Sequence, residues 1–178
     1  VLTPTFTGLG ERAHLLTHEV GLDTHVQDIV NVFDWEELRR ATIVAHSYAG
    51  MIAAGLTERI ADRIERIIFL DALVPRNGES WSDLHPANLR EAVTKAVMEH
   101  GEGWRMPVAN ATAFGIKELT DVEWVNRRLT PHPFKTYTDK LALPSNALAR
   151  TPKLYIDCTD PALASLNGVK ARVREAGW

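Results

Sequence analysis

The sequence has 178 residues, of which 45% are hydrophobic and 24% are charged, and it carries a net charge of −3. This length allows one domain with a substantial core and excludes two domains of ordinary size. The weak negative charge gives no reason to expect nucleic acid or a membrane surface as a partner, and no apolar run reaches the ~20 residues of a membrane span. Cys158 is the only cysteine, so the chain can form no internal disulfide, which is typical of a cytoplasmic protein.

The beginning of the chain is predicted to contain a strand, a loop and the start of a helix. Residues 1–7 are β-prone but include a proline, which predicts a short strand. The loop at residues 8–12 has two glycines without the third that opens a dinucleotide-binding helix, so no cofactor is expected. His14 and His18 are four residues apart, and we interpret them as solvated loop histidines rather than metal ligands. A Thr-x-x-Gln capping box at residues 24–27 then predicts the start of a helix.

Two strands are predicted next, with a helix between them. Residues 41–46 contain a β-branched run, and residues 64–70 are almost continuously apolar. The small apolar residues that follow Gly50 suit a helix packed flat on a sheet and running to about Ala61. Strand, helix and strand in this order predict a right-handed crossover and an α/β fold. A strand that is apolar throughout is typical of a parallel sheet covered on both faces.

The turn between the first of these strands and the helix has a serine at its apex, Ser47. Strand, sharp turn and helix around a serine form the arrangement called a nucleophile elbow. The strained backbone requires small residues two positions before and after the serine, and these are Ala45 and Ala49, where the usual pattern has glycine. His46 matches a common variant of the motif, and its side chain is expected to point away from Ser47. The alternative is an ordinary loop serine or a helix N-cap at Ser47.

Residues 76–150 differ from the flanking segments because prolines interrupt them repeatedly. Helices are predicted within them at residues 88–99 and 121–129. We interpret this segment as a lid inserted between sheet strands. Its aromatic side chains would roof a substrate pocket: Trp81, Trp104, Trp124 and Phe134. The alternative is that these side chains only pack the lid on the body. The chain then returns to the sheet with a strand at residues 152–157 and ends in a short helix at residues 169–176.

Four stretches in this order resemble the α/β-hydrolase superfamily, and within it the small esterase and hydroxynitrile-lyase-like group. They are residues 3–12, residues 21–28, the elbow at residues 41–55 and residues 69–75. The resemblance implies a partial α/β-hydrolase fold, with a mostly parallel sheet flanked by helices and a helical lid. Residues 1–75 and 151–178 would form the incomplete hydrolase core, and residues 76–150 the lid. It also implies a small ester-like substrate, with no cofactor and no metal.

The resemblance and the strand ends together assign roles in the site. Ser47 would be the nucleophile, and the backbone N–H of Tyr48 would stabilise the oxyanion. Two aspartates at the carboxyl ends of strands compete as the acid that orients the base. Asp71 is preferred to Asp160, because a proline and an apolar stretch follow Asp160 at once. Both are expected at the same edge of the sheet as Ser47, and His46 is expected to join the lid aromatics along the substrate pocket.

No histidine takes the expected place of the general base. In the superfamily this histidine follows the acid, in a loop after the final strand, and no histidine follows Asp160. His85, His100 and His132 all lie in the lid segment. The chain begins without methionine and ends within a helical pattern, so both ends look cut. The resemblance implies a further strand, which carries the second oxyanion donor and lies between residues 1–7 and the nucleophile strand.

We therefore expect the parent protein to be a carboxylesterase that acts on small esters by acyl transfer through Ser47. One alternative is a lyase on the same fold that cleaves a cyanohydrin, which a cationic residue in the pocket would favour. The other is a non-catalytic small-molecule binding module that lacks the base. The 178-residue chain alone is expected to hydrolyse esters no faster than its Ser47→Ala variant. The expected partner is a small molecule, and a homodimer is compatible with the sequence.

Overall fold

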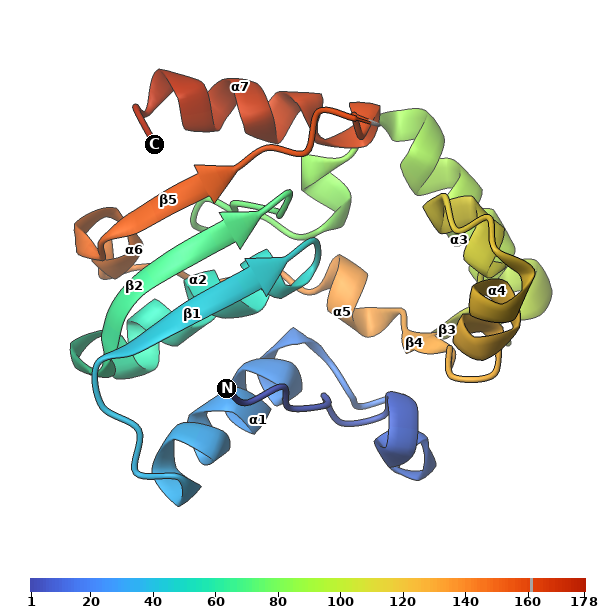
Figure 1. Ribbon diagram of the computed structural model, residues 1–178, viewed down its shortest axis with the longest axis horizontal. Helices are drawn as coiled ribbons and strands as arrows, with labels where there is room; N and C mark the ends of the chain where they lie inside the picture. Colours follow the sequence, from blue (N-terminus) through green and yellow to red (C-terminus); the bar gives the residue numbers. More distant parts are fainter. Residues whose placement is uncertain (161) are drawn as a thin grey trace.

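The main sheet has three parallel strands. The computed structural model describes residues 1–160 and 162–178. In spatial order the strands are β1 (Ala41–His46), β2 (Ile64–Leu70) and β5 (Lys153–Ile156). Figure 1 shows α2 (Ala49–Ile60) behind these strands and α7 (Asn167–Glu175) beside β5. The parallel order, with a crossover helix between β1 and β2, confirms the predicted α/β fold.

The helix α1 (Leu22–Trp35) packs on α2, and the remaining elements lie outside the main sheet. The others are α3 (Ala87–His100), α4 (Leu119–Asn126), α5 (Lys135–Thr138), α6 (Ala147–Arg150), the paired two-residue strands β3 (Arg105–Met106) and β4 (His132–Pro133), and 3-10 helices at Gly10–Leu15, Ala61–Arg63, Ser82–Leu84, Ala111–Phe114 and Ala164–Leu166. The helices predicted at residues 88–99 and 169–176 are present with slightly different ends. The predicted helix at residues 121–129 begins earlier, at Leu119.

The helix α1 begins at Leu22, before the predicted capping box. The Gly21 N–H donates to the Thr24 hydroxyl (3.3 Å), so Thr24 supports the start of the helix from inside its first turn. The Leu22 N–H donates to the Asp139 side chain (3.0 Å). A carboxylate far away in the sequence therefore satisfies one of the unpaired N–H groups that every helix start exposes, and the local pattern could not reveal it.

Residues 1–7 are not a strand, in contrast to the prediction, because no described strand pairs with them. Side chains hold this segment instead. The N–H and the hydroxyl of Thr7 donate to Asp28 (2.6 and 2.8 Å), and Arg12 donates to the Thr5 carbonyl (2.8 Å). Between this segment and β1 lies a largely apolar groove of about 580 Å³, which α1 and α2 also line. The groove lies where the family resemblance implies a further strand.

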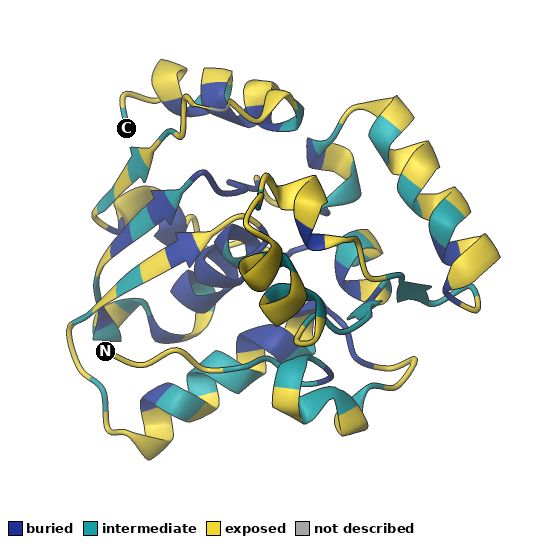
Figure 2. Cartoon of the chain, turned by 45° about the vertical axis from the view of Figure 1, so that its right-hand side comes forward, coloured by how far each residue is buried: buried dark blue, intermediate teal, exposed yellow. Residues whose placement is uncertain are grey.

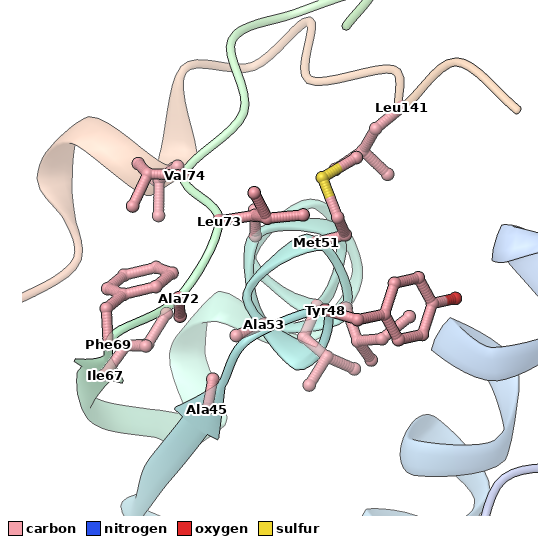
Figure 3. Packing of buried hydrophobic residues seen from close by; sticks show 14 of the residues in the cluster. Ala45, Tyr48, Met51, Ala53, Ile67, Phe69, Ala72, Leu73, Val74 and Leu141 are labelled. Carbon is pink, nitrogen blue, oxygen red and sulfur yellow. The ribbon is translucent and has the colours of Figure 1, made fainter. Parts of the chain in front are cut away.

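The core lies between α2 and one face of the sheet. Met51 of α2 and Ile67 and Phe69 of β2 are completely buried there, and Figure 3 shows these side chains together around the start of α2. In Figure 2 the dark blue of buried residues is concentrated on α2 and the adjoining strands. The nucleophile turn is therefore built on the most closely packed part of the molecule.

The opposite face of the sheet is open to solvent in the described residues, which corrects the prediction that both faces are covered. Val44 of β1 (61% exposed) is aligned through Ile68 with Leu154 of β5 (38%), and Ile156 (46%) lies two residues further on. Paired residues, and residues two apart in a strand, point to the same face. We call Val44, Leu154 and Ile156 the open face. Apolar strand sequence looks the same whether or not a helix covers it, which is why the prediction failed.

Residues 76–150 divide into two parts. The elements α3, α4, β3 and β4 lie in a flank beside the sheet, where α3 and α4 are mostly exposed (Figures 1 and 2). By contrast, Leu141, Leu143 and Leu148 belong to the main hydrophobic cluster. None of the described helices is both long enough and apolar enough to cross a membrane.

Candidate active site

The turn after β1 has the geometry of a nucleophile elbow. Ser47 has a φ of 52°, in the left-handed region that a non-glycine residue adopts only under constraint. Its carbonyl accepts hydrogen bonds from the N–H groups of Gly50 (3.1 Å) and Leu73 (3.0 Å), and its own N–H donates to the Leu70 carbonyl (3.4 Å). These bonds fix the turn between the strand and the first turn of α2, and Ser47 is exposed at its apex.

Close packing explains the small residues around this turn. Ala45 is almost fully buried. A methyl group on Gly50 would lie 2.0 Å from the Leu73 carbonyl oxygen, which is far inside van der Waals contact. The backbone of α2 therefore comes into close contact with the segment after β2 at Gly50. This position directly follows Ala49, the small residue that the elbow motif requires.

Asp71 follows β2 at the same edge of the sheet as Ser47, and its carboxylate already has a cationic partner. The Nζ of Lys170, in α7, lies 2.8 Å from Asp71 Oδ1 and 2.6 Å from Asp157 Oδ1. The side chains of Lys170 and Asp71 are only 5% and 9% exposed. Burial by itself lowers the pKa of Lys170, but hydrogen bonds with Asp157 and Asp71 raise it above its ordinary value, so the ammonium keeps its charge. This buried ion pair joins α7 to the ends of two strands.

Asp160 lies in an exposed turn after β5, and Pro161, which follows it, is outside the described residues. Because β5 runs parallel to β2, Asp160 follows the same edge of the sheet as Asp71. Asp71 is tied to the elbow through its neighbours, since Leu70 and Leu73 both bond to the backbone of Ser47. The structure thus brings Ser47 and Asp71 together through backbone hydrogen bonds.

Tyr48 lies in a buried group of rings beside the elbow. Nδ1 of His25 is 3.0 Å from the Tyr48 hydroxyl, and the ring centroids of His132 and Tyr137 are 5.0 and 6.0 Å from that of Tyr48. In Figure 3 the Tyr48 ring points away from Phe69 and the rest of the labelled core. Burial lowers the pKa of His25, and burial together with the neighbouring His25 lowers the pKa of His132 to about 3. Both imidazoles are therefore neutral at pH 7.

The structure separates the four aromatic residues predicted to roof the pocket. Trp81 and Phe134 both lie near Tyr137, with centroid distances of 4.3 and 6.5 Å. Trp104 stacks on the ring of His18 (4.0 Å) instead. Trp124 is 53% exposed and is covered by the guanidinium of Arg128. Trp81 and Phe134 thus connect to Tyr48 through Tyr137, whereas Trp124 contacts Arg128, which lies just after the end of α4.

No histidine in the described part of the chain is hydrogen-bonded to the Ser47 hydroxyl. His25 is bonded to Tyr48, and Nδ1 of His85 is 2.9 Å from the Trp81 carbonyl. Nε2 of His132 is buried without a hydrogen-bond partner. His46 is exposed and lines the groove between β1 and residues 1–6. The described histidines therefore leave the place of the general base unfilled.

Sequence reasoning alone does not single out three residues that shape this site. Gly50 could have been found from the elbow motif, since it stands three residues after the serine. His25 lies inside residues 21–28, a stretch that carries the family resemblance, but its bond to Tyr48 depends on the fold. Lys170 leaves no local signal, because its two partners come from the ends of β2 and β5.

Comparison with known proteins identifies the family. A sequence model described as the alpha/beta hydrolase family matches residues 1–177. The chain is an α/β-hydrolase. It is 36% identical over 172 residues to the carbendazim hydrolyzing esterase of Nocardioides sp. (strain SG-4G), a match that covers 91% of this chain and 70% of that protein. It is 24% identical over 103 residues to esterase YbfF of Escherichia coli (strain K12), covering 55% of this chain and 41% of that esterase.

Solved structures support the same fold for this α/β-hydrolase. An extracellular α/β-hydrolase from a Paenibacillus species superposes with a TM-score of 0.77 at 21% identity, over 89% of this chain and 65% of that one. The pyrethroid hydrolase PytH superposes with a TM-score of 0.64 at 15% identity, over 97% and 72% of the two chains. The α/β-hydrolase chain thus spans about two thirds of the first structure. The family match and the esterase relatives make it an esterase-like hydrolase, and the solved structures support its fold.

Proposed function

We propose that this α/β-hydrolase acts on small carboxylic esters by acyl transfer through Ser47. The observation that carries the proposal is the left-handed backbone of Ser47 at the apex of a strand–turn–helix. An N-cap serine normally has an extended backbone, so capping does not account for this conformation. Other left-handed residues such as Glu37 and Arg40 lie in loops, so it is the position of Ser47 between β1 and α2 that gives its conformation weight. The esterase relatives support the same class of reaction.

In the proposed reaction Ser47 Oγ attacks the ester carbonyl, and negative charge develops on the carbonyl oxygen. The N–H of Tyr48 lies at the start of α2, where a helix leaves its first N–H groups unpaired and carries partial positive charge. This N–H would therefore stabilise the oxyanion. Loss of the alcohol leaves an acyl group on Ser47, which water then removes.

The proposal also needs an acid and a base. Asp71 and Asp160 are both candidates for the acid, since both follow strands at the edge where Ser47 lies. Lys170 already holds Asp71, so an imidazole would share that carboxylate with the ammonium or would use Asp160. The base is a histidine that the described residues do not provide at Ser47.

The alternative of a cyanohydrin lyase gains no support from this site. Such a lyase would be favoured by an uncompensated cationic residue beside the nucleophile. Lys170 is cationic and lies next to Asp71, but the carboxylates of Asp71 and Asp157, the second of them shared with Arg174, balance its charge. Hydrolysis is therefore the function that we propose.

A fluorophosphonate probe tests the proposal, because it reacts with activated serines. We expect the probe to label Ser47 alone, at a rate that rises with added imidazole, since a diffusing base can accept the serine proton. Mass spectrometry of the peptides locates the label. Ser47→Ala should abolish the labelling, and Ser145→Ala, at an exposed serine outside the site, should leave it unchanged. If no imidazole concentration produces labelling, the chain is better explained as a binding module.

A further inference from the structure

We propose that His25 is a positioning residue for the nucleophile elbow, because its hydrogen bond to the Tyr48 hydroxyl fixes the residue that directly follows Ser47. Fixing Tyr48 would also position its N–H as an oxyanion donor, and this part of the inference rests on the proposed function. The link between α1 and the elbow is independent of the proposed function. His25 is in α1, and Tyr48 is the N-cap residue of α2, so one side chain connects two helices at the strained turn.

The two partners of the His25 ring determine where its proton lies. The Thr7 carbonyl can only accept, so Nε2 carries the proton and donates to it (3.0 Å). Nδ1 of the neutral ring is then an acceptor, and the Tyr48 hydroxyl donates to it (3.0 Å). The opposite tautomer would place a nitrogen lone pair against the Thr7 carbonyl. The two bonds therefore hold the ring in one orientation.

Burial keeps this arrangement rigid. His25 is 0% exposed and Tyr48 is 9% exposed. The ring of Phe6 stacks on the imidazole with centroids 4.8 Å apart and planes inclined by 13°. Thr7, the second partner of His25, is itself held by Asp28 through its N–H and its hydroxyl. A continuous set of contacts thus connects α1 to the phenol of Tyr48.

The same contacts bear on the strain at Ser47. A left-handed non-glycine residue persists only where its surroundings over-determine it. Leu73 and Gly50 bind the Ser47 carbonyl from one side, and Tyr48 continues the chain on the other. Because the phenol of Tyr48 is tied to α1, the bond to His25 opposes rotation of the backbone at the start of α2.

Two substitutions at position 25 separate its two bonds. In His25→Asn the side-chain oxygen replaces Nδ1 and can accept from Tyr48. In His25→Gln the side-chain N–H group replaces the Nε2 donor and can bind Thr7. Tyr48→Phe removes only the hydroxyl. Thr57→Val is the matched control, since Thr57 is a buried residue of α2 that would lose one bond, to the Ala54 carbonyl (2.7 Å).

Native-state hydrogen exchange of the full chain, measured by NMR, reports on the elbow without requiring activity. The informative amides are those of Gly50 and Leu73, which both donate to the Ser47 carbonyl. We expect these amides to exchange about fivefold to tenfold faster in His25→Gln and in Tyr48→Phe, as the loss of one hydrogen bond implies. His25→Asn should change them by less than about twofold. The effects of His25→Gln and Tyr48→Phe should be clearly less than additive in the double variant, because both substitutions break the bond between His25 and Tyr48, while Tyr48→Phe also removes a hydrogen bond with Thr136.

The control and a second measurement make the inference falsifiable. Thr57→Val should leave the exchange of Gly50 and Leu73, relative to the interior of α2, unchanged. If His25→Asn and His25→Gln act alike, or if exchange rises evenly along the chain, His25 has only a general structural role and the inference is wrong. Fluorophosphonate labelling with imidazole should be slower in His25→Gln at unchanged probe affinity. If the unmodified chain is not labelled at all, the proposed function fails, while the exchange result still decides the role of His25.

Discussion

At the scale of single residues, the constraint on Ser47 comes from a neighbour three positions later. Ala45 and Ala49 keep the turn narrow, but each carries a methyl group, whereas Gly50 lies against the backbone of Leu73 and has no room for one. The elbow pattern of small residues therefore describes how closely two backbone segments approach. It tolerates alanine on the flanks of the serine and requires glycine at the point of contact.

Replacing Gly50 with alanine should lower the free energy of unfolding by about 1–3 kcal/mol, because the new methyl group must displace the Leu73 backbone. In an unobstructed helix the same substitution stabilises by about 0.5–1 kcal/mol. Gly168 in α7 is the matched control, since nothing lies within 4 Å of a Cβ built there. Urea unfolding of Gly50→Ala and Gly168→Ala should give opposite signs. Stabilisation by both would show that α2 does not approach Leu73 closely.

At the scale of elements, the structures that could be predicted are those whose signals are local. The signals for the strand–turn–helix from Ala41 to Ile60 lie in consecutive residues, so it could be predicted, and the structure confirms it. Residues 1–7 have a strand-like sequence as well, but a strand also needs a hydrogen-bonded neighbour, which the sequence of the segment itself cannot supply. The side chains of Asp28 and Arg12 hold this segment instead.

Three elements meet where His132 of β4 and His25 of α1 contact Tyr48 at the start of α2. Burial lowers the pKa of both histidines, to about 3 for His132. In the unfolded chain each titrates near its ordinary value of about 6.5. Between pH 6.5 and 3 the unfolded chain therefore binds more protons than the folded chain, and acid favours unfolding.

The free energy of unfolding should consequently fall as the pH is lowered from 7 to 5, by about 1.4 kcal/mol per pH unit below 6.5 for His132, and His25, whose pKa is also lowered, should add to this fall. Phenylalanine has no titratable group, so the His132→Phe variant should lose the contribution of His132 to this dependence of stability on pH. His100→Phe, at an exposed histidine of α3, should keep the full slope. Urea unfolding at several pH values measures it. A slope that His132→Phe leaves intact would mean that His132 is accessible to protons in the folded state.

At the scale of the whole molecule, the site depends on contacts between distant parts of the chain. Lys170 joins α7 to Asp71 and Asp157, and Asp139 caps α1. Neither contact has a periodicity or a spacing that could predict it, because each pairs residues from separate elements. The sequence therefore predicts which strands and helices surround Ser47, while the charges that hold them at the sheet edge emerge only from the fold.

We expect the 178-residue chain to hydrolyse short p-nitrophenyl esters no faster than its Ser47→Ala variant when no imidazole is added. A serine hydroxyl is a weak nucleophile without a base, and no described histidine is bonded to Ser47. Initial rates of p-nitrophenol release test this, with the Ser145→Ala variant as a control for nonspecific hydrolysis. Rapid turnover that depends on Ser47 would contradict this expectation. His85→Gln and His132→Gln would then identify the base.

The open face has a consequence for how folding of this chain is judged at the bench. Dyes such as ANS fluoresce on apolar surface, and their binding is commonly taken as a sign of loosely packed, partly folded protein. Here Val44, Leu154 and Ile156 offer such a surface in the folded state, while Ile67 and Phe69 on the other side of the same sheet are completely buried. The folded chain should therefore bind the dye brightly and still unfold in a cooperative transition. In this chain the dye signal would report the exposed face of the sheet rather than loss of packing.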